Sequence, residues 1–303
     1  MVRPASFGFN LQTAASNTFQ VRENIAAARE LQRQAAAEFD ALARTLSESG
    51  VKVIIGADSA EPVKPDAIFP NNWVSFHADG AVVLYPMLAP NRRLERREDL
   101  LRQVSREGGF HVSRTIDLSH HEAADKFLEG TGSLVLDRTM RLAYACSSSR
   151  THLDVLGEFA QQLDYRVVSF DAFGADGTAI YHTNVMMSVG RKFAVVCLAS
   201  IADPAARSTV SRLLAESGRS VLELSMRQLQ NFAGNLLELH SAQGPLIAIS
   251  AAAWESLDAG QRRMLESFAH VLPAEIPAIE RIGGGSVRCM LAEIHLPRAL
   301  PPG

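Results

Sequence analysis

Short apolar runs recur along the chain, and each run follows a turn-forming or polar residue. Their starts lie roughly 50–60 residues apart, a spacing typical of an internal structural repeat. The five runs are FPNNWVSF from Phe69, EGTGSLVLD from Glu129, YHTNVMMSVG from Tyr181, NFAGNLLELH from Asn231 and GGGSVRCMLAEIHLP from Gly283. Short runs that are rich in Val, Ile, Leu and Met and bounded by turn formers predict buried strands.

Apolar positions at helical spacing fill several of the segments between these runs. We expect helices over residues 26–49, 150–163, 203–217 and 256–271. Gly50 and Gly218 stand where the C-terminus of a helix favours a left-handed residue. A further β run follows some of the helices: VKVIIGAD from Val51, YRVVSF from Tyr165 and SVLEL from Ser220. The repeating unit is therefore a strand pair, a helix and another strand.

This ββαβ unit, repeated about five times, predicts an α/β protein built by radial repetition. Such an arrangement closes on itself and brings polar strand ends to a common axis, where we expect a site. The alternative is an open α/β sheet whose spacing is periodic by chance. No Pro/Gly/Ser-rich linker divides the sequence, so we predict one domain over residues 1–303.

Composition narrows the class of protein. A hydrophobic content of 47% indicates a globular protein with a sizeable core, and a net charge of −3 makes nucleic acid an unexpected partner. No apolar run approaches the roughly 18 residues that span a bilayer, and residues 1–20 do not resemble a signal peptide. We therefore expect a cytoplasmic protein without a membrane partner. Its three cysteines are widely spaced, which argues against a disulfide framework or a structural zinc site.

Three repeats carry residues suited to nucleophilic chemistry. Cys289 follows a Gly-rich stretch that permits close approach of a ligand, whereas Cys146 and Cys197 lie in apolar runs and are expected in the core. His182 begins the third run, and Glu129 begins the second. Each residue alone has a structural interpretation as a core, surface or capping residue. Together they supply a thiol, an imidazole and a carboxylate at equivalent places of different repeats.

Five segments carry a family resemblance that spans nearly the whole chain. They are PDAIFPNNW (65–73), LEGTGSLVLDR (128–138), SSSRT (147–151), YHTNV (181–185) and GGGSVRCM (283–290). In this order they resemble the pentein superfamily of arginine deiminases, dimethylarginine dimethylaminohydrolases and amidinotransferases. They are most similar to the deiminase-related group of citrulline-utilisation hydrolases. The resemblance implies a single pentein catalytic domain, a five-bladed α/β propeller of ββαβ repeats with pseudo-fivefold symmetry.

The resemblance also implies roles for individual residues. Cys289 corresponds to the nucleophile, His182 to the general acid/base and Glu129 to the carboxylate that grips the substrate nitrogens. Asp66 resembles a further acidic site residue. A planar guanidinium would hold the carboxylate of an amino acid, and the candidates are Arg150 together with Arg92 or Arg93, of which Arg93 is preferred.

Two departures from the family pattern bear on the substrate. Asn72 and Asn184 stand where deiminases and dimethylargininases usually have Asp. Two carboxylates suit a guanidinium cation, whereas an amide offers both a donor and an acceptor to a neutral ureido group. The substitutions therefore favour a citrulline-like over an arginine-like substrate.

The predicted reaction is hydrolysis of L-citrulline to L-ornithine, ammonia and carbon dioxide through a thioester on Cys289. It requires neither a metal nor an organic cofactor. The alternatives are an arginine or methylarginine deiminase, an amidinotransferase, and a non-catalytic pentein that only binds. The partner is a small amino-acid substrate, and association into a homodimer is left open.

Overall fold

Four β-sheets repeat one connectivity, as the alternation of apolar runs and helical patterns predicts. The structure, a computed structural model, describes residues 1–21 and 28–299. In each of these sheets an antiparallel strand pair is followed, after at least one helix, by a third strand parallel to the second. The strands are β3 (Val74–Phe76), β4 (Ala81–Leu84) and β5 (Arg114–Asp117); β6 (Val135–Asp137), β7 (Leu142–Cys146) and β8 (Arg166–Phe170); β9 (Met187–Val189), β10 (Phe193–Val196) and β11 (Ser220–Glu223); and β12 (Leu237–Ser241), β13 (Gly244–Ser250) and β14 (His270–Ala274). The protein therefore has an α/β fold with mixed sheets.

A fifth, smaller sheet departs from this pattern. It consists of two parallel strands, β1 (Val2–Arg3) and β2 (Gly56–Ala57). The run from Val51 was expected to form a longer strand, but only its Gly56–Ala57 part pairs. The run from Gly283 was also expected to be strand-like. It instead contains a π-helix, η6 (Ile279–Gly283), that ends in its first residue, and a 3-10 helix, η7 (Val287–Met290), which holds Cys289.

Most expected helices are present with slightly different bounds. They are α1 (Ala28–Glu48), α5 (Leu153–Leu163), α6 (Pro204–Glu216) and α9 (Ala259–Glu266), while residues 26 and 27 of the first expected helix lie outside the described residues. Helix α9 is shorter than the expected helix over 256–271. It begins after Asp258, whose side chain accepts from Gln261 N as the N-cap, and residues 270 and 271 belong to β14; α8 (Ala251–Ser256) precedes it. Gly50 and Gly218 adopt the left-handed conformation that was expected of them, with φ of +82° and +72°. The sequence pattern missed α2 (Pro90–Arg93), α3 (Glu98–Gly108) and α7 (Met226–Gln230).

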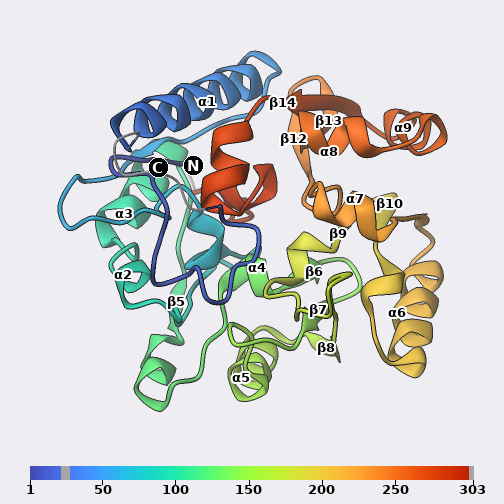
Figure 1. The fold of residues 1–303 in the computed structure, drawn as a ribbon. Coiled ribbons are helices and arrows are strands. Elements are labelled where there is room, and N and C mark those ends of the chain that lie inside the picture. The colour runs from blue at the N-terminus through green and yellow to red at the C-terminus, as the bar shows by residue number, and fades with distance from the viewer. Residues whose placement is uncertain (22–27, 300–303) are drawn as a thin grey trace.

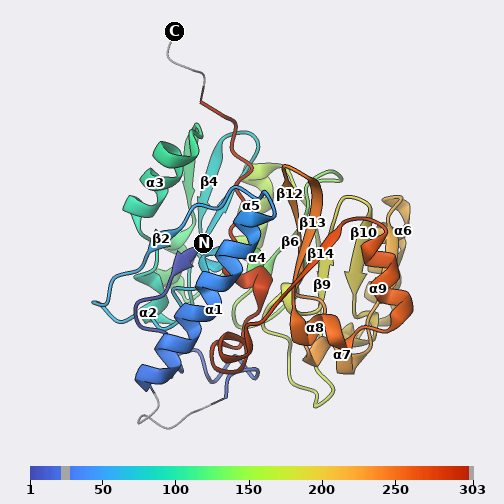
Figure 2. The same ribbon diagram turned by 90° about the horizontal axis from the view of Figure 1, so that it is seen from above.

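Helices lie at the rim and strands nearer the middle. Figure 1 shows α1, α3, α5, α6 and α9 around the outside, with the short helix α4 (Gly130–Ser133) close to the centre, and Figure 2 gives the perpendicular view. The inner strands are buried, and β10 reads Phe-Ala-Val-Val because both of its faces are covered. Helix α1 places Leu31, Phe39 and Leu46 on the sheet that contains Leu246 and Leu272. No helix in the described part of the chain has the length and apolarity to cross a membrane.

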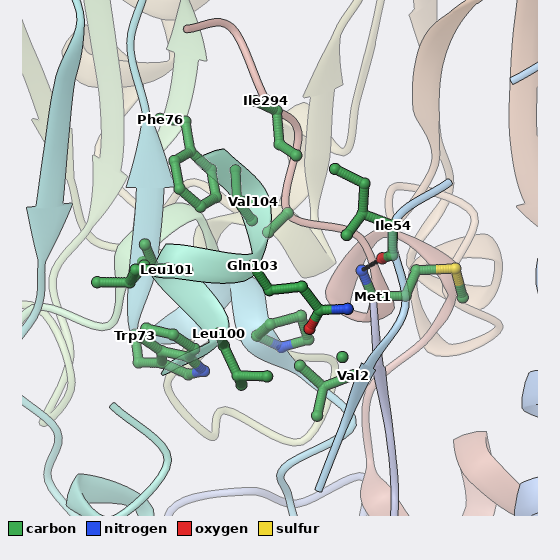
Figure 3. A pocket seen from close by; sticks show the side chains of 14 residues that line it. Met1, Val2, Ile54, Trp73, Phe76, Leu100, Leu101, Gln103, Val104 and Ile294 are labelled. Atoms are coloured by element: carbon green, nitrogen blue, oxygen red, sulfur yellow. Dashed lines mark hydrogen bonds between the residues drawn. The ribbon is translucent and has the colours of Figure 1, made fainter. Parts of the chain in front are cut away.

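A small apolar pocket lies where the small sheet packs against helix α3. Figure 3 shows Val2, Ile54 and Ile294 on one side of it, and Leu100 and Phe76 across from them. The extended segment that follows Cys289 therefore lies beside β1 and the residues just before β2. Segments that are far apart in the sequence therefore pack against one another around this pocket.

Each of the four large sheets begins just after a tight turn, and three of these turns are short helices. The turns before β3, β6 and β9 are η2 (Pro70–Asn72), α4 and η4 (Thr183–Val185). Helix α4 contacts both η2 and η4, and η2 contacts η7. This close approach needs residues without side chains: a Cβ on Gly130 would lie 2.3 Å from Asn71 O, and one on Gly132 would lie 2.4 Å from Asn72 Nδ2. The turns therefore meet where the predicted site residues lie.

Candidate active site

Cys289 lies in η7 with its sulfur facing two amide nitrogens. The residue is 4% exposed, and its Sγ lies 3.6 Å from Asn184 Nδ2 and 3.4 Å from Asn235 Nδ2. The amide of Asn235 has a fixed orientation. Its Oδ1 accepts from Arg288 N at 3.1 Å, and its Nδ2 donates to the backbone oxygen of Asn184 at 2.9 Å. The thiol also lies 3.7 Å from Asn235 Oδ1, so the amide of Asn235 offers the sulfur both a donor and an acceptor.

Glu129 and His182 form a buried hydrogen-bonded pair. Glu129 is the N-cap residue of α4, His182 is that of η4, and Nε2 of the histidine lies 2.9 Å from Oε2 of the carboxylate. Both side chains are buried. Burial opposes the charge of Glu129, but Arg150 and His182 outweigh it and hold the pKa of the carboxyl below its usual range. An ionised carboxylate only accepts, so Nε2 carries the hydrogen and Nδ1 of His182 has the free lone pair.

The imidazole is neutral at rest. Burial lowers the pKa of His182 to about 4, and the raising effect of Glu129 only partly offsets this. Neutral His182 can accept a proton at Nδ1. The resulting imidazolium would be stabilised by Glu129, which makes the pair suited to proton transfer in both directions.

Two buried arginines balance the carboxylates of the site. Arg150 Nη1 lies 3.2 Å from Glu129 Oε2, and its guanidinium stacks on the ring of Tyr181 at 4.8 Å. Arg92 pairs with both oxygens of Glu95 and donates to Asn72 Oδ1 at 2.9 Å. Since each guanidinium is fixed by several partners, both groups are rigid parts of the wall.

A small cavity lies in front of these groups. Its lining within the described residues consists of Asn17, Asp66, Phe69, Asn72, Arg92, Arg150, Tyr181, His182, Gly283, Gly284, Gly285 and Cys289. The N-terminal segment closes one side, because Asn10 Nδ2 donates to Asp66 Oδ2 at 2.7 Å and Asn17 Nδ2 donates to Gly284 O at 3.2 Å. The free space between these side chains holds about one water molecule, so a larger ligand must displace part of the lining when it binds.

Several buried polar atoms at or near the cavity have no partner. Among the described residues these include Asn72 Nδ2 and Asp66 Oδ1 in the lining, and Asn184 Oδ1 on a residue beside Cys289. Burial is also the main cause that raises the pKa of Asp66, against the lowering effect of Arg92 and Asn10. A buried polar atom without a partner costs about 1–3 kcal/mol, so these three atoms mark positions where a ligand would bind. They offer one donor and two acceptors.

Most residues predicted from the sequence lie at this site, but two differ from their expected places. Glu129 is not part of the described cavity wall, because Leu88 N occupies its Oε1 while His182 and Arg150 occupy its Oε2. Its carboxylate therefore contacts His182 and Arg150, and its contact with a substrate stays a prediction. Arg93 also lies elsewhere, with its guanidinium held by the carbonyl of Met87 and by Glu122, whereas its neighbour Arg92 lines the cavity.

The backbone around two predicted residues also differs from expectation. His182 and Asn184 were expected on one face of a strand, but η4 begins at Thr183 and the strand β9 only at Met187. The turn, not strand alternation, brings Asn184 to the sulfur.

Sequence reasoning missed Asn235 and Tyr181. Asn235 precedes β12 as Asn72 precedes β3, and aligning these two runs on their first strand residue would have found it. The sequence pattern identified Tyr181 only as the first residue of the third apolar run. Its hydroxyl donates to Gly284 O at 2.5 Å and its ring supports Arg150, which no local pattern indicates.

Comparison with known proteins agrees with this architecture. The family described as N,N dimethylarginine dimethylhydrolase, eukaryotic, matches residues 3–296. No curated protein matches the sequence significantly.

Three solved structures have a similar fold. One is the N-terminal domain of ArgZ, an arginine dihydrolase from the ornithine–ammonia cycle in cyanobacteria, as a Cys-to-Ser variant with bound substrate. Its TM-score is 0.72 at 19% identity, with 98% of each chain covered. The second, a Cys-to-Ala variant of AgrE with L-arginine, has a TM-score of 0.72 at 18% identity and covers 96% of this chain and 39% of that one. The third is DDAH from Pseudomonas aeruginosa, a Cys-to-Ser variant with citrulline, with a TM-score of 0.65 at 14% identity and 95% of each chain covered. The chain spans only 38% of the chain in the structure of ArgZ itself.

Proposed function

Since the chain belongs to the N,N-dimethylarginine dimethylhydrolase family of the pentein superfamily, and is thus a hydrolase of C–N bonds, we propose that its substrate is L-citrulline. The products are L-ornithine, ammonia and carbon dioxide. Four ββαβ sheets, together with the small sheet and the extended segment after Cys289, are interpreted as the five blades of a propeller within one domain. The short turns between blades carry the chemistry.

The observation that carries this proposal is a pair of amides: Asn72 lies in the cavity lining, and Asn184 lies beside the sulfur of Cys289. Asn72 Nδ2 is an unpartnered donor and Asn184 Oδ1 an unpartnered acceptor. A ureido group presents a carbonyl oxygen to accept and N–H groups to donate, so it satisfies both atoms. A guanidinium presents only donors, and it would leave Asn72 Nδ2 facing another donor. The site therefore favours the neutral group.

The first step forms a thioester. Neutral His182 takes the thiol proton of Cys289 at Nδ1, and the thiolate, held by Asn184 and Asn235, attacks the ureido carbon. The imidazolium, stabilised by Glu129, then gives the proton to the terminal nitrogen. The C–N bond breaks, ammonia leaves, and the carbonyl carbon remains bonded to the sulfur and to the ornithine nitrogen.

The second step consumes water. His182, neutral again, removes a proton from a water molecule as its oxygen attacks the thioester carbon. The C–S bond breaks, the thiolate recovers the proton, and the released carbamate decomposes to ornithine and carbon dioxide. One water molecule is consumed for each ammonia and each carbon dioxide released, so the atoms balance.

The other groups at the cavity orient the substrate. Arg92 and Arg150 place positive charge in the wall, to which an amino-acid carboxylate would be attracted. Asp66 Oδ1 accepts from a nitrogen of the substrate. Arg150 keeps the carboxylate-binding role that the sequence predicted for it. Arg92 takes this role in place of Arg93, because Arg92 lines the cavity.

Product analysis tests the proposal. Purified protein is supplied with citrulline, arginine, methylarginines or agmatine, and ammonia, ornithine and citrulline are quantified. Ornithine formed from citrulline, and lost in Cys289→Ala, is the expected result. Citrulline accumulating from arginine would instead establish the second candidate, a deiminase, which the family match and the unpartnered carboxylate oxygen of Asp66 favour.

A further inference from the structure

A group of metal-binding side chains lies on the surface, on elements that hold none of the residues lining the cavity. His120 and His121 belong to the 3-10 helix η3 (Ser119–Ala124), and Glu158 projects from α5, which Figure 1 shows at the rim. One ligand atom of each residue lies within 4.8 Å of the others. Nε2 of His121 is 2.7 Å from Glu158 Oε2, and Nε2 of His120 is 3.7 Å from the same oxygen.

The first histidine is oriented as a ligand would be. His120 Nδ1 lies 3.1 Å from the backbone oxygen of Asp117 and donates its hydrogen there, so the lone pair is on Nε2, which faces Glu158. Metal-ligating histidines almost always donate their second ring nitrogen to a carbonyl or carboxylate in this way. The proposed site therefore has an outer partner already in place.

The backbone of both elements is fixed. His121 N donates to Leu118 O at 3.1 Å, its carbonyl accepts from Lys126 N at 3.2 Å, and Leu118 is fully buried. Helix α5 packs Val155 and Phe159 into the core, which holds Glu158 opposite η3. The three ligand groups need only small side-chain adjustments to surround one ion.

We propose that His120, His121 and Glu158 bind a divalent transition-metal ion of the zinc type. Two imidazole nitrogens and one carboxylate oxygen suit Zn²⁺ and its neighbours, whereas Mg²⁺ and Ca²⁺ require oxygen ligands. Water completes the coordination, because His120 is exposed. The ion replaces the hydrogen bond between His121 and Glu158 and ties η3 to α5.

The proposed metal site lies next to the segment of Met87 and Leu88, which contacts Glu129. Glu122, the residue after His121, accepts from Met87 N at 2.8 Å, and Leu88 N donates to Glu129 at 3.1 Å. An ion bound here would therefore fix η3, whose Glu122 holds the segment of Met87 and Leu88 next to Glu129. Binding of the ion can be tested without measuring turnover.

Binding is measured by equilibrium dialysis of the Cys289→Ala protein against Zn²⁺, which removes the thiol as a competing ligand. We expect one ion per chain, with binding weakened about 10-fold or more in His121→Ala and in Glu158→Gln, since each lacks a ligand. The matched control is His111→Ala, an exposed histidine outside the cluster, which should bind as the parent does. Circular dichroism verifies that the variants are folded.

Two results would overturn the assignment. One is the absence of Zn²⁺ binding to the parent at 100-fold molar excess over protein. The other is unchanged binding in both His121→Ala and Glu158→Gln, which would place the ion at other ligands. Neither result bears on citrulline hydrolysis, so failure here is distinguishable from failure of the proposed reaction.

Discussion

The side-chain nitrogen of Asn235 lies 3.4 Å from the sulfur of Cys289 and 2.9 Å from the backbone oxygen of Asn184. The two hydrogens of one amide thus join the proposed nucleophile to the turn that carries a second donor. Because Asn235 is fully buried and is not part of the described cavity lining, its effect on a substrate passes through the sulfur.

Replacing Asn235 by Ala should lower kcat about 10- to 100-fold, since a hydrogen bond to a charged group contributes about 1.5–3 kcal/mol. KM should change little. The rate of Cys289 alkylation by iodoacetamide checks the cause, because a sulfur that has lost the donor at 3.4 Å should react more slowly. Asn231→Ala, in the same run but bonded to Arg227 O, is the control. A loss of kcat with an unchanged alkylation rate would contradict the positioning role.

Asn72→Asp should exchange substrate preference. The new carboxylate retains the bond to Arg92 and presents a charged acceptor where Nδ2 was unpartnered. We expect kcat/KM to fall about 10-fold or more for citrulline and to rise for arginine, as charge-assisted pairing replaces a neutral match. The ratio of the two kcat/KM values is the measurement. Equal losses on both substrates would mean that the amide does not set the preference.

Glu129→Gln should destabilise the protein by about 3–5 kcal/mol, because it leaves Arg150 buried beside an uncharged amide. Activity should also be lost, since the imidazolium of His182 would no longer be stabilised. Urea unfolding gives the free energy. In the double variant Glu129→Gln/Arg150→Met the loss should be less than the sum of the single losses. Additive losses would refute the coupling.

The lowered pKa of His182 predicts how the free energy of unfolding depends on pH. The folded value of about 4 lies below the usual 6.5, so between these values the unfolded chain binds more protons and His182 contributes stability that rises with pH. The free energy of unfolding of the native protein minus that of His182→Gln should increase by on the order of 3 kcal/mol from pH 4 to pH 6.5. Burial raises the pKa of Glu95 to about 7, which acts in the opposite direction but in both proteins. His111→Gln is the control, and a difference that is flat with pH would disprove the assignment.

Gly132→Ala should abolish most activity. Its Cβ would lie 2.4 Å from Asn72 Nδ2 and 2.7 Å from the ring of His182, so both groups must move. Gly157→Ala, on α5 with open space around it, should leave activity unchanged and stabilise the helix by about 0.5–1 kcal/mol. Turnover and urea unfolding of the two variants give the comparison. Normal turnover in Gly132→Ala would mean that the turns tolerate wider separation than the structure indicates.

The sequence predicted the ββαβ unit because several strands and the helices α1, α5 and α6 carry local periodicity. It also identified the thiol, the imidazole and two of the three amides discussed here, Asn72 and Asn184, which lie in recognisable runs. It could not predict contacts with distant partners. Leu88 N and Arg150 occupy the oxygens of Glu129, and no spacing in the second run reveals them.

The same reason explains the choice between two adjacent arginines. Arg92 is directed to the cavity by Glu95 and Asn72, and Arg93 is held away by Met87 and Glu122. Helix α2 sets this difference, and its four residues are too few to show a period. Periodicity therefore indicates the elements, whereas side-chain partners decide what faces the cavity.

The short turns before the sheets have an evolutionary consequence. They hold or adjoin the proposed site residues but do not take part in strand pairing. A substitution in a turn can therefore change the chemistry of the site while the strand hydrogen bonds and the core preserve the fold. Similar structures at 14–19% identity show how far sequences diverge on this scaffold. New substrates can thus arise through single changes at separate turns, each tested by selection without first rebuilding the fold.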